Sequence, residues 1–302
     1  MSILWLTETA DHGQVNALNT TAISIAIEFT RAMTFPAIVL KFDDMLNDGV
    51  SNMRDFAQLI SQDPSLTATL LRFANSPLYG FSGKVSTIDG AVSLIGMQEI
   101  RDLVFAVSIR KTFDKLPNNT TIMVDFWRHS LCCALASKQI AEVVGHSQKA
   151  VLFTGGLMHA IGSLAMFSQI PDDCAEVFRR VSCSSDGTRI FQLEREIIGF
   201  DHHEVGAEIA KAWRFPGILR DIINFSHVPD EAPEHQFESS IVHVGDVLAT
   251  MVELAMGAPL TVPSVSSSAL AYIQLDEEQL SPMIPQVQAL FHEMRPVFGI
   301  SA

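Results

Sequence analysis

Helical periodicity is the feature of this 302-residue chain that most constrains its fold. From Ala22 onward, apolar residues recur at helical spacing, and Pro, Gly, Asn and Asp punctuate the pattern. Strict alternation of apolar and polar residues, which would indicate strands, survives nowhere for more than a few positions. The sequence therefore predicts an all-α protein.

The stretch 61–80 shows the helical signals most clearly. Asp63 can accept backbone N–H bonds as an N-cap, and Pro64 suits the first position of a helix. The apolar residues that follow share one helix face: Leu66, Leu70, Leu71 and Ala74. We expect a packed helix after Asp63, followed by a long turn from Asn75 to Val85.

The same reasoning divides the rest of the chain into helices and connections. Further helices are expected at 22–33, 36–48, after a cap at Ser51 or Asn52, and at 89–94, 97–113, 122–144, 148–169, 172–183, 188–198, 202–213, 217–226 and 237–256, with two or three shorter ones after Val265. The polar stretch 114–121 is either a loop or a linker between two halves. As a linker, it divides an N-terminal helical bundle (1–116) from a second helical half with C-terminal helices (117–302).

Composition excludes several classes of protein. With 48% hydrophobic and 18% charged residues, the chain has the makeup of a compact globule and not of a disordered segment. The formal net charge of −14, with no Lys/Arg stripe to offset it, opposes binding to phosphate backbones and to anionic lipid. We expect no nucleic-acid partner and no membrane partner.

The cysteines and the N-terminal residues bear on the compartment. Four cysteines are too sparse for a disulfide framework, so we expect free, largely buried thiols: Cys132, Cys133, Cys174 and Cys183. The N-terminus lacks a basic region followed by a long apolar run, and no later segment approaches about twenty uninterrupted apolar residues. These features favour a cytoplasmic protein.

Two ordered motifs resemble the signatures of a known family. The stretch 61–80 resembles the first signature of the HDOD family (HD-related output domain), a bacterial signalling module. The residues from Thr87 to Gly96, continuing through Ile100 to Leu103, resemble its second signature in the expected order. The resemblance implies a signal-transduction protein in which an N-terminal helical bundle packs against an HD-like helical bundle.

The resemblance also implies a site in the second half of the chain, which is similar to HD-type metal phosphohydrolases. In those enzymes a first His, a His-Asp doublet and a distant Asp hold divalent metals that activate water against a phosphate ester. Matched position by position, His129 is the first His, His159 the doublet His and Asp246 the last Asp. Ala160 stands where the doublet aspartate belongs.

This departure from the family pattern weakens the expected metal site. A methyl group cannot ligate a metal, so we expect no catalytic residue and no cofactor. The alternative is a single Zn or Fe(II) ion, which two imidazoles and one carboxylate can hold if they converge. In the metal-free interpretation, His129 and His159 hydrogen-bond to Asp246 or to Asp125, which lies one turn before His129.

Five residues are predicted to bind a ligand: Arg72, Asn75, His202, His227 and His243. Each has a structural alternative. Asn75 can end its helix while Arg72 covers apolar surface with its stem. Asp201 can cap a helix with Glu204 as its capping-box partner, which places His202 in the first turn. A histidine on an apolar helix is usually a core or surface residue, so we expect at most two or three of the candidate histidines to cluster.

The sequence leads to one functional hypothesis and two alternatives. The first is a non-catalytic regulatory HDOD protein that binds a separate signalling protein or a nucleotide-like small ligand, with a homodimer as an option. One alternative is a metal-dependent phosphohydrolase of nucleotides or cyclic dinucleotides, and the other is a purely structural adaptor. Ala160 is the residue that separates the first hypothesis from the hydrolase.

Overall fold

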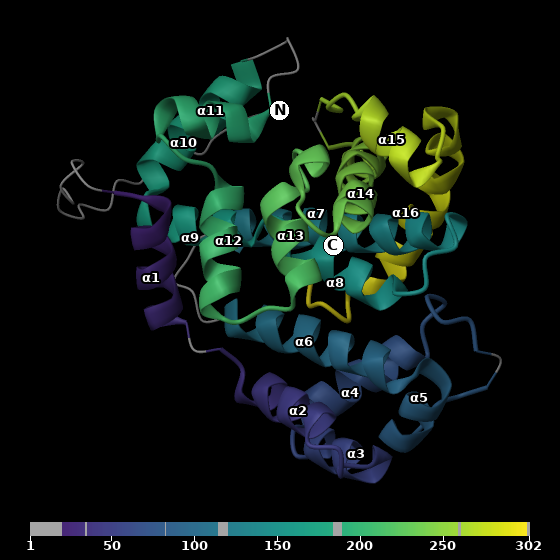
Figure 1. Ribbon diagram of the computed structural model, residues 1–302. Helices are drawn as coiled ribbons and strands as arrows, with labels where there is room; N and C mark the ends of the chain where they lie inside the picture. Colours follow the sequence, from purple (N-terminus) through teal and green to yellow (C-terminus); the bar gives the residue numbers. More distant parts are fainter. Residues whose placement is uncertain are drawn as a thin grey trace.

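The computed structural model describes residues 20–33, 35–81, 83–113, 120–183, 189–258 and 261–300. Within these ranges every regular element is a helix, which confirms the all-α prediction (Figure 1). The helices between residues 37 and 113 form a bundle at the lower end of the view in Figure 1, and the first helix and the later helices form the larger upper part.

Five helices make up the N-terminal bundle: α2 (Ala37–Asn47), α3 (Met53–Ser61), α4 (Pro64–Ala74), α5 (Ile88–Ile95) and α6 (Met97–Phe113). The cap predicted for α4 is confirmed, because Asp63 Oδ1 accepts the backbone N–H of Leu66 at 2.9 Å and Pro64 is the first helical residue. Helix α4 packs against α3, α5 and α6, which closes the bundle.

The first helix, α1 (Ala22–Ala32), packs away from this bundle. It lies against α12 (His202–Ala212) and α9 (Ile161–Gln169), both in the second half of the chain. The predicted boundary between residues 116 and 117 lies outside the described residues. The division into two domains at that point stays a prediction.

Helix α7 (Thr120–Val143) is central to the second half. It packs against α8 (Lys149–Met158), α14 (Gln236–Ala255) and α16 (Ile284–Met294). The remaining elements are α10 (Pro171–Cys183), α11 (Ile190–Ile197), α13 (Gly217–Phe225), η1 (Pro229–Glu231), α15 (Ser267–Ile273), η2 (Glu277–Gln279) and η3 (Ser281–Met283).

Two glycines allow α7 to lie unusually close to its neighbours. A Cβ atom on Gly156 in α8 would lie 2.8 Å from the Cα of Ala134. A Cβ atom on Gly245 in α14 would lie 3.1 Å from the backbone nitrogen of Ser137. Both atoms belong to backbone that cannot move without displacing α7, so only glycine fits. The close approach brings the three helices that carry the candidate site together.

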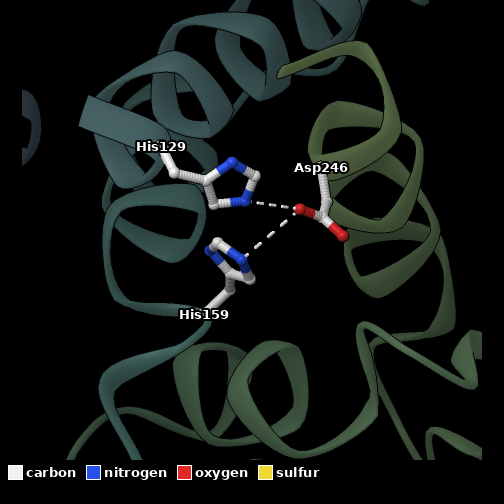
Figure 2. Close-up of side chains that lie close together, drawn as sticks. All are labelled: His129, His159 and Asp246. Atoms are coloured by element: carbon white, nitrogen blue, oxygen red, sulfur yellow. Dashed lines mark hydrogen bonds and ion pairs between the residues drawn. The ribbon is translucent and has the colours of Figure 1, made fainter. Parts of the chain in front are cut away.

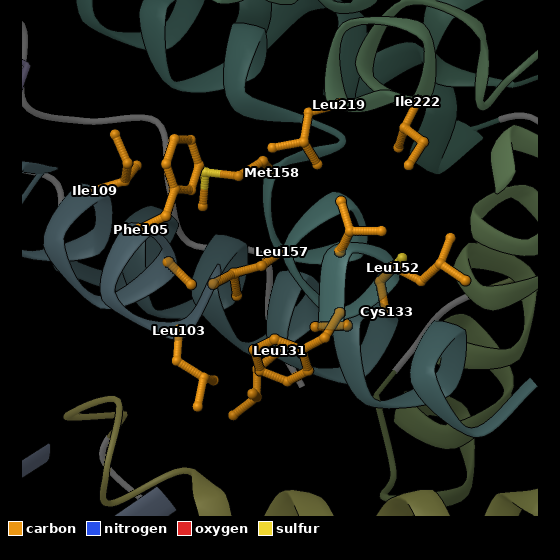
Figure 3. Close-up of a cluster of buried hydrophobic side chains, with 14 of the residues drawn as sticks. Leu103, Phe105, Ile109, Leu131, Cys133, Leu152, Leu157, Met158, Leu219 and Ile222 are labelled. Atoms are coloured by element: carbon orange, nitrogen blue, oxygen red, sulfur yellow. The ribbon is translucent and has the colours of Figure 1, made fainter. Parts of the chain in front are cut away.

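The N-terminal bundle and the second half share one hydrophobic core. Helix α8 packs against α6, α7 and α13. Figure 3 shows buried side chains from these four helices, which include Leu103, Phe105, Ile109, Leu131, Leu157, Met158 and Leu219. The same cluster continues from α1 to the residues that follow α16. Packing across this contact fixes the orientation of the two halves.

The single helix predicted over 148–169 is wrong, because the chain breaks between α8 and α9. Ala160 has φ −105° and ψ 24°, outside the helical range. The His159 ring donates Nδ1–H to the carbonyl of Gly156 at 2.7 Å, a carbonyl that a continuous helix would pair with the N–H of Ala160. Apolar residues run across the break, so the periodicity gave no sign of it.

In the part of the chain that the structure describes, one helical stretch, Lys149–Gln169, is long and apolar enough to cross a membrane. In the folded chain 83% of its apolar window is buried inside the protein, which is the pattern of a core element.

Three cysteines, Cys132, Cys133 and Cys174, are free and buried, as predicted, and burial raises the pKa of each thiol. The side chain of Cys183 is outside the described part of the chain.

Candidate functional site

Three helices bring the predicted metal ligands together. His129 comes from α7, His159 directly follows α8, and Asp246 comes from α14 (Figure 2). One ligand atom from each side chain lies within 4.8 Å of the other two. Residues 117 positions apart in the chain thus form one donor group.

The ring of His129 lies between two carboxylates. Its Nε2 is 2.8 Å from Asp246 Oδ1, and its Nδ1 is 2.8 Å from Glu253 Oε2. A carboxylate oxygen accepts, so each ring nitrogen donates an N–H and the ring is an imidazolium. Burial acts to lower the pKa of His129, but the hydrogen bonds and charges of the two carboxylates raise it to about 10.

The contact with His129 also keeps the carboxyl of Asp246 in its charged form. Burial acts to raise the pKa of this carboxyl, but the hydrogen bond and charge of His129 outweigh it and hold the pKa well below its usual range. The side chain of Asp246 is 34% exposed and that of His129 is 29% exposed, so solvent reaches both partners.

His159 presents a lone pair to the same carboxylate. Its Nδ1–H is donated to the Gly156 carbonyl, and burial lowers the pKa of the ring to about 4, so the ring is neutral at pH 7. Nε2 of the neutral ring is then an acceptor. It lies 3.6 Å from Asp246 Oδ1, which is also an acceptor, and a cation held between the two atoms would stabilise both.

The donor set fits one borderline metal ion. Two imidazole nitrogens and one carboxylate oxygen are the ligands that Zn or Fe(II) takes in proteins. Ala160 contributes a methyl group at the point where the family pattern has a carboxylate, and in the described residues the donor group holds three side chains. A second ion would lack the bridging oxygen.

Glu253 is the residue of this site that the sequence reasoning missed. Its side chain is 5% exposed, and it follows Asp246 by seven residues, which places both on one face of α14. That spacing was the only available signal. The metal-free alternative that paired His129 with Asp125 is wrong, because Asp125 pairs with Arg128 at 2.7 Å and is 52% exposed.

Of the predicted ligand-binding residues, His202 is bonded to a buried carboxylate. Its Nδ1 lies 2.6 Å from Glu194 Oε2, and the same oxygen accepts the backbone N–H of His202 at 3.0 Å. Burial acts to lower the pKa of His202, but Glu194 outweighs it, so the pKa is raised. His202 lies in the first turn of α12, as expected.

The cap at the start of α12 forms in part. Asp201 Oδ1 accepts the backbone N–H of Glu204 at 2.9 Å, which confirms the predicted N-cap. The carboxylate of Glu204 lies 3.4 Å from Arg195 Nε, where it is drawn away from the capping-box position.

His227 belongs to a row of three imidazoles. Its ring stacks on that of His203, with centroids 4.0 Å apart and planes at 14°, and His203 in turn lies 4.0 Å from His202. Burial lowers the pKa of His227 to about 4. The candidate histidines therefore gather in small groups: the pair in the metal site and this row.

The ring of His243 forms hydrogen bonds with two separate segments of the chain. Its Nδ1–H is donated to the carbonyl of Ser226 at 2.8 Å, and its Nε2 accepts the backbone N–H of Ser266 at 3.1 Å. Both ring nitrogens are thus engaged with backbone. A ligand role for His243 stays a prediction, as it does for His202 and His227.

Asn75 and Arg72 differ in their surroundings. The Asn75 amide donates to the carbonyls of Leu71 and Val85 at 2.6 and 2.7 Å, and its oxygen accepts the N–H of Val85 at 2.8 Å. The side chain therefore closes the turn after α4. Arg72 lies exposed in the last turn of α4.

Comparison with known proteins gives a family match over most of the chain. The model of the HDOD domain matches residues 32–229. Among curated proteins, the chain is 22% identical over 259 residues to an uncharacterized protein of Treponema pallidum (strain Nichols), which covers 85% of this chain and 49% of that protein. The chain spans about half the length of this curated relative.

Two solved structures share the fold over nearly their whole length. A Geobacter sulfurreducens HDOD domain protein of unknown function is 27% identical, with a TM-score of 0.72, and the match covers 90% of this chain and 98% of that one. A Shewanella amazonensis SB2B protein, described as a suspected phosphohydrolase, is 25% identical with a TM-score of 0.68, covering 91% and 98%.

Proposed function

The chain belongs to the HDOD domain family, and from that premise we propose that it is a non-catalytic signal-transduction protein. It acts by binding a separate signalling protein or a nucleotide-like small ligand. The observation that carries the proposal is the three-donor group, in which Ala160 supplies no oxygen. Two-metal hydrolysis needs a ligand that bridges the ions, and a methyl group cannot be one.

The charges of the site support the same interpretation. One imidazolium, on His129, faces the carboxylates of Asp246 and Glu253. Without a metal, the His129 imidazolium is paired with both carboxylates, so neither of its ring nitrogens is left without a partner. A binding protein that descends from a metal enzyme can retain such residues because they stabilise the fold.

The net charge of −14 bears on the kind of partner. An acidic protein surface associates faster with a basic partner surface, and it repels an acidic partner surface. We therefore favour a protein partner whose contact face is neutral or basic.

A metal-dependent phosphohydrolase is the second candidate function, and one observation favours it. His129, His159 and Asp246 converge well enough to hold a single divalent ion. When bound, such an ion lowers the pKa of water and polarises a phosphate ester. His159 would keep its lone pair directed to the ion through its bond to Gly156, and Asp246 would supply the negative charge.

A phosphodiesterase assay tests the proposal. Purified protein is incubated with Mn²⁺ or Fe²⁺ and with bis(p-nitrophenyl) phosphate or a cyclic dinucleotide, beside the His159→Ala variant. We expect the wild type and the variant to show the same background rate. Turnover in the wild type that disappears in His159→Ala would overturn the proposal and establish the hydrolase.

Partner capture separates a regulatory protein from a structural adaptor. Once a partner is identified, its affinity is measured for the wild type and for His129→Gln and Asp246→Asn. A regulatory role through the site predicts weaker binding in both variants. Equal affinity in all three proteins would favour the adaptor.

A further inference from the structure

Glu253 contacts the site from the side opposite to Asp246. Its carboxylate is 2.8 Å from His129 Nδ1, its side chain is 5% exposed, and both carboxylates project from α14 onto the same ring. The protein therefore fixes both edges of one imidazole. Neither the family pattern nor the donor group includes Glu253.

The choice of ring nitrogen decides what His129 can do. A histidine that binds a metal uses one nitrogen and usually donates the other N–H to a carboxylate or carbonyl, which orients the ring. Here Nε2 is directed to Asp246, on the side where His159 also lies, while Nδ1 is held by Glu253. A ring flip would direct Nε2 away from the donor group.

We infer that Glu253 is a positioning residue, which holds Nδ1–H of His129 so that Nε2, which gives up its proton to solvent when a cation binds, faces a divalent cation shared with His159 and Asp246. The inference rests on the single-ion site described above for the second candidate function, and it requires no turnover. Glu253 itself does not touch the ion.

The chain offers a matched control on the same helix. Glu238 also lies on α14 and also pairs with a histidine of the second half, since its Oε1 is 3.2 Å from His146 Nε2. It precedes Asp246 by eight residues, or about 12 Å along a helix. Its replacement removes a similar hydrogen bond without reaching the donor group.

Zinc binding measured by calorimetry tests the inference on four proteins: wild type, Glu253→Gln, Glu253→Met and Glu238→Met. We expect Glu253→Met to bind Zn²⁺ about 10- to 100-fold more weakly than the wild type, because the ring is no longer oriented. Glu253→Gln keeps an oxygen that accepts Nδ1–H, so it should restore most of the affinity. Glu238→Met should match the wild type.

A second readout separates orientation from loss of structure. Co²⁺ replaces Zn²⁺, and the visible absorption of the bound ion reports its ligands. The wild type and Glu253→Gln should give the same spectrum, while Glu253→Met should give the altered spectrum of a site with a lost or misplaced nitrogen. Circular dichroism checks that each variant is folded.

Three results would overturn the inference. They are equal Zn²⁺ affinity in the wild type and Glu253→Met, an equal loss in Glu238→Met, or no Zn²⁺ uptake by the wild type. The last result would leave the non-catalytic function standing. Turnover abolished by His159→Ala would reject that function and leave the role of Glu253 untouched.

Discussion

The His129 ring makes the unfolding free energy of the protein depend on pH. Its pKa is raised to about 10 in the folded chain, against about 6.5 in an unfolded one. A raised pKa contributes stability that is fully present below pH 6.5 and is lost as the pH rises toward 10. The contribution should therefore decline steadily across the alkaline range.

Denaturant unfolding of the wild type and His129→Gln between pH 6 and pH 10 measures this decline. Glutamine does not titrate, so the difference in unfolding free energy between the two proteins isolates the histidine. We expect that difference to be largest near pH 6 and to shrink as the pH rises. A difference that is constant over this range would show that the ring is not held as a cation.

The Asn75 side chain should contribute to stability through the turn it closes. Replacement by alanine removes three hydrogen bonds to the backbone of Leu71 and Val85, which we expect to cost about 1–3 kcal/mol of unfolding free energy. Arg72→Ala, at an exposed position on the same helix, should change it by less than about 0.5 kcal/mol. Equal effects in thermal or urea unfolding would contradict the structural role of Asn75.

At the scale of helices, the approach of α8 to α7 depends on Gly156. An alanine there would place Cβ 2.8 Å from backbone atoms of Ala134 and Cys133, so the helices must separate, at a cost of about 1–3 kcal/mol. Gly217→Ala is the control, because its nearest neighbour outside the helix would be 3.4 Å away. Urea unfolding should show a clear loss for Gly156→Ala and little change for the control; a reversed order would exclude close packing as the cause.

The elements that could be predicted from the sequence are those with local causes. Asp63 and Asp201 indicate helix N-termini because each can accept a hydrogen bond from the residue three positions later, and the structure contains both caps. Such bonds depend only on neighbouring residues, so the pattern of residue types reveals them. The order of the helices followed from the same signals.

The missed features depend on contacts between distant elements. The break after α8 arises at His159, whose side chain competes for a helix carbonyl, and an apolar run shows no trace of that competition. In the sequence, Glu253 is recognisable only as a glutamate in a predicted helix. Its contact with His129 forms only when α7 packs against α14. Of the site, three residues could be matched through the family resemblance, while the fourth needed the packing.

At the scale of the whole molecule, Lys138 connects the two halves. Its Nζ lies 3.9 Å from the ring centroid of Tyr79 and 3.8 Å from Glu99 Oε1, both in the N-terminal part, while Lys138 itself is on α7. The lysine side chain is 4% exposed, and burial lowers its pKa. A buried ammonium needs these partners.

Glu99→Gln should therefore destabilise the protein by about 1–3 kcal/mol, because the Lys138 charge stays buried without its carboxylate. Glu208→Gln is the control: Glu208 is also 3.8 Å from a lysine, Lys211, but that lysine is 72% exposed. An exposed pair contributes about 0–1 kcal/mol. Equal losses in the two variants would mean that the contact between the halves gains nothing from the buried charge.

For the molecule as a whole, the number of metal ions that the chain can hold separates recognition from hydrolysis. The proposed function, recognition without hydrolysis, rests on a site that lacks an oxygen donor where Ala160 stands. Its most direct test is the metal-to-protein ratio, measured by mass spectrometry after incubation with excess Zn²⁺ or Mn²⁺ and desalting, with Ala160→Asp alongside. We predict no more than one ion per wild-type chain and a higher ratio in Ala160→Asp; two tightly held ions in the wild type would contradict the account.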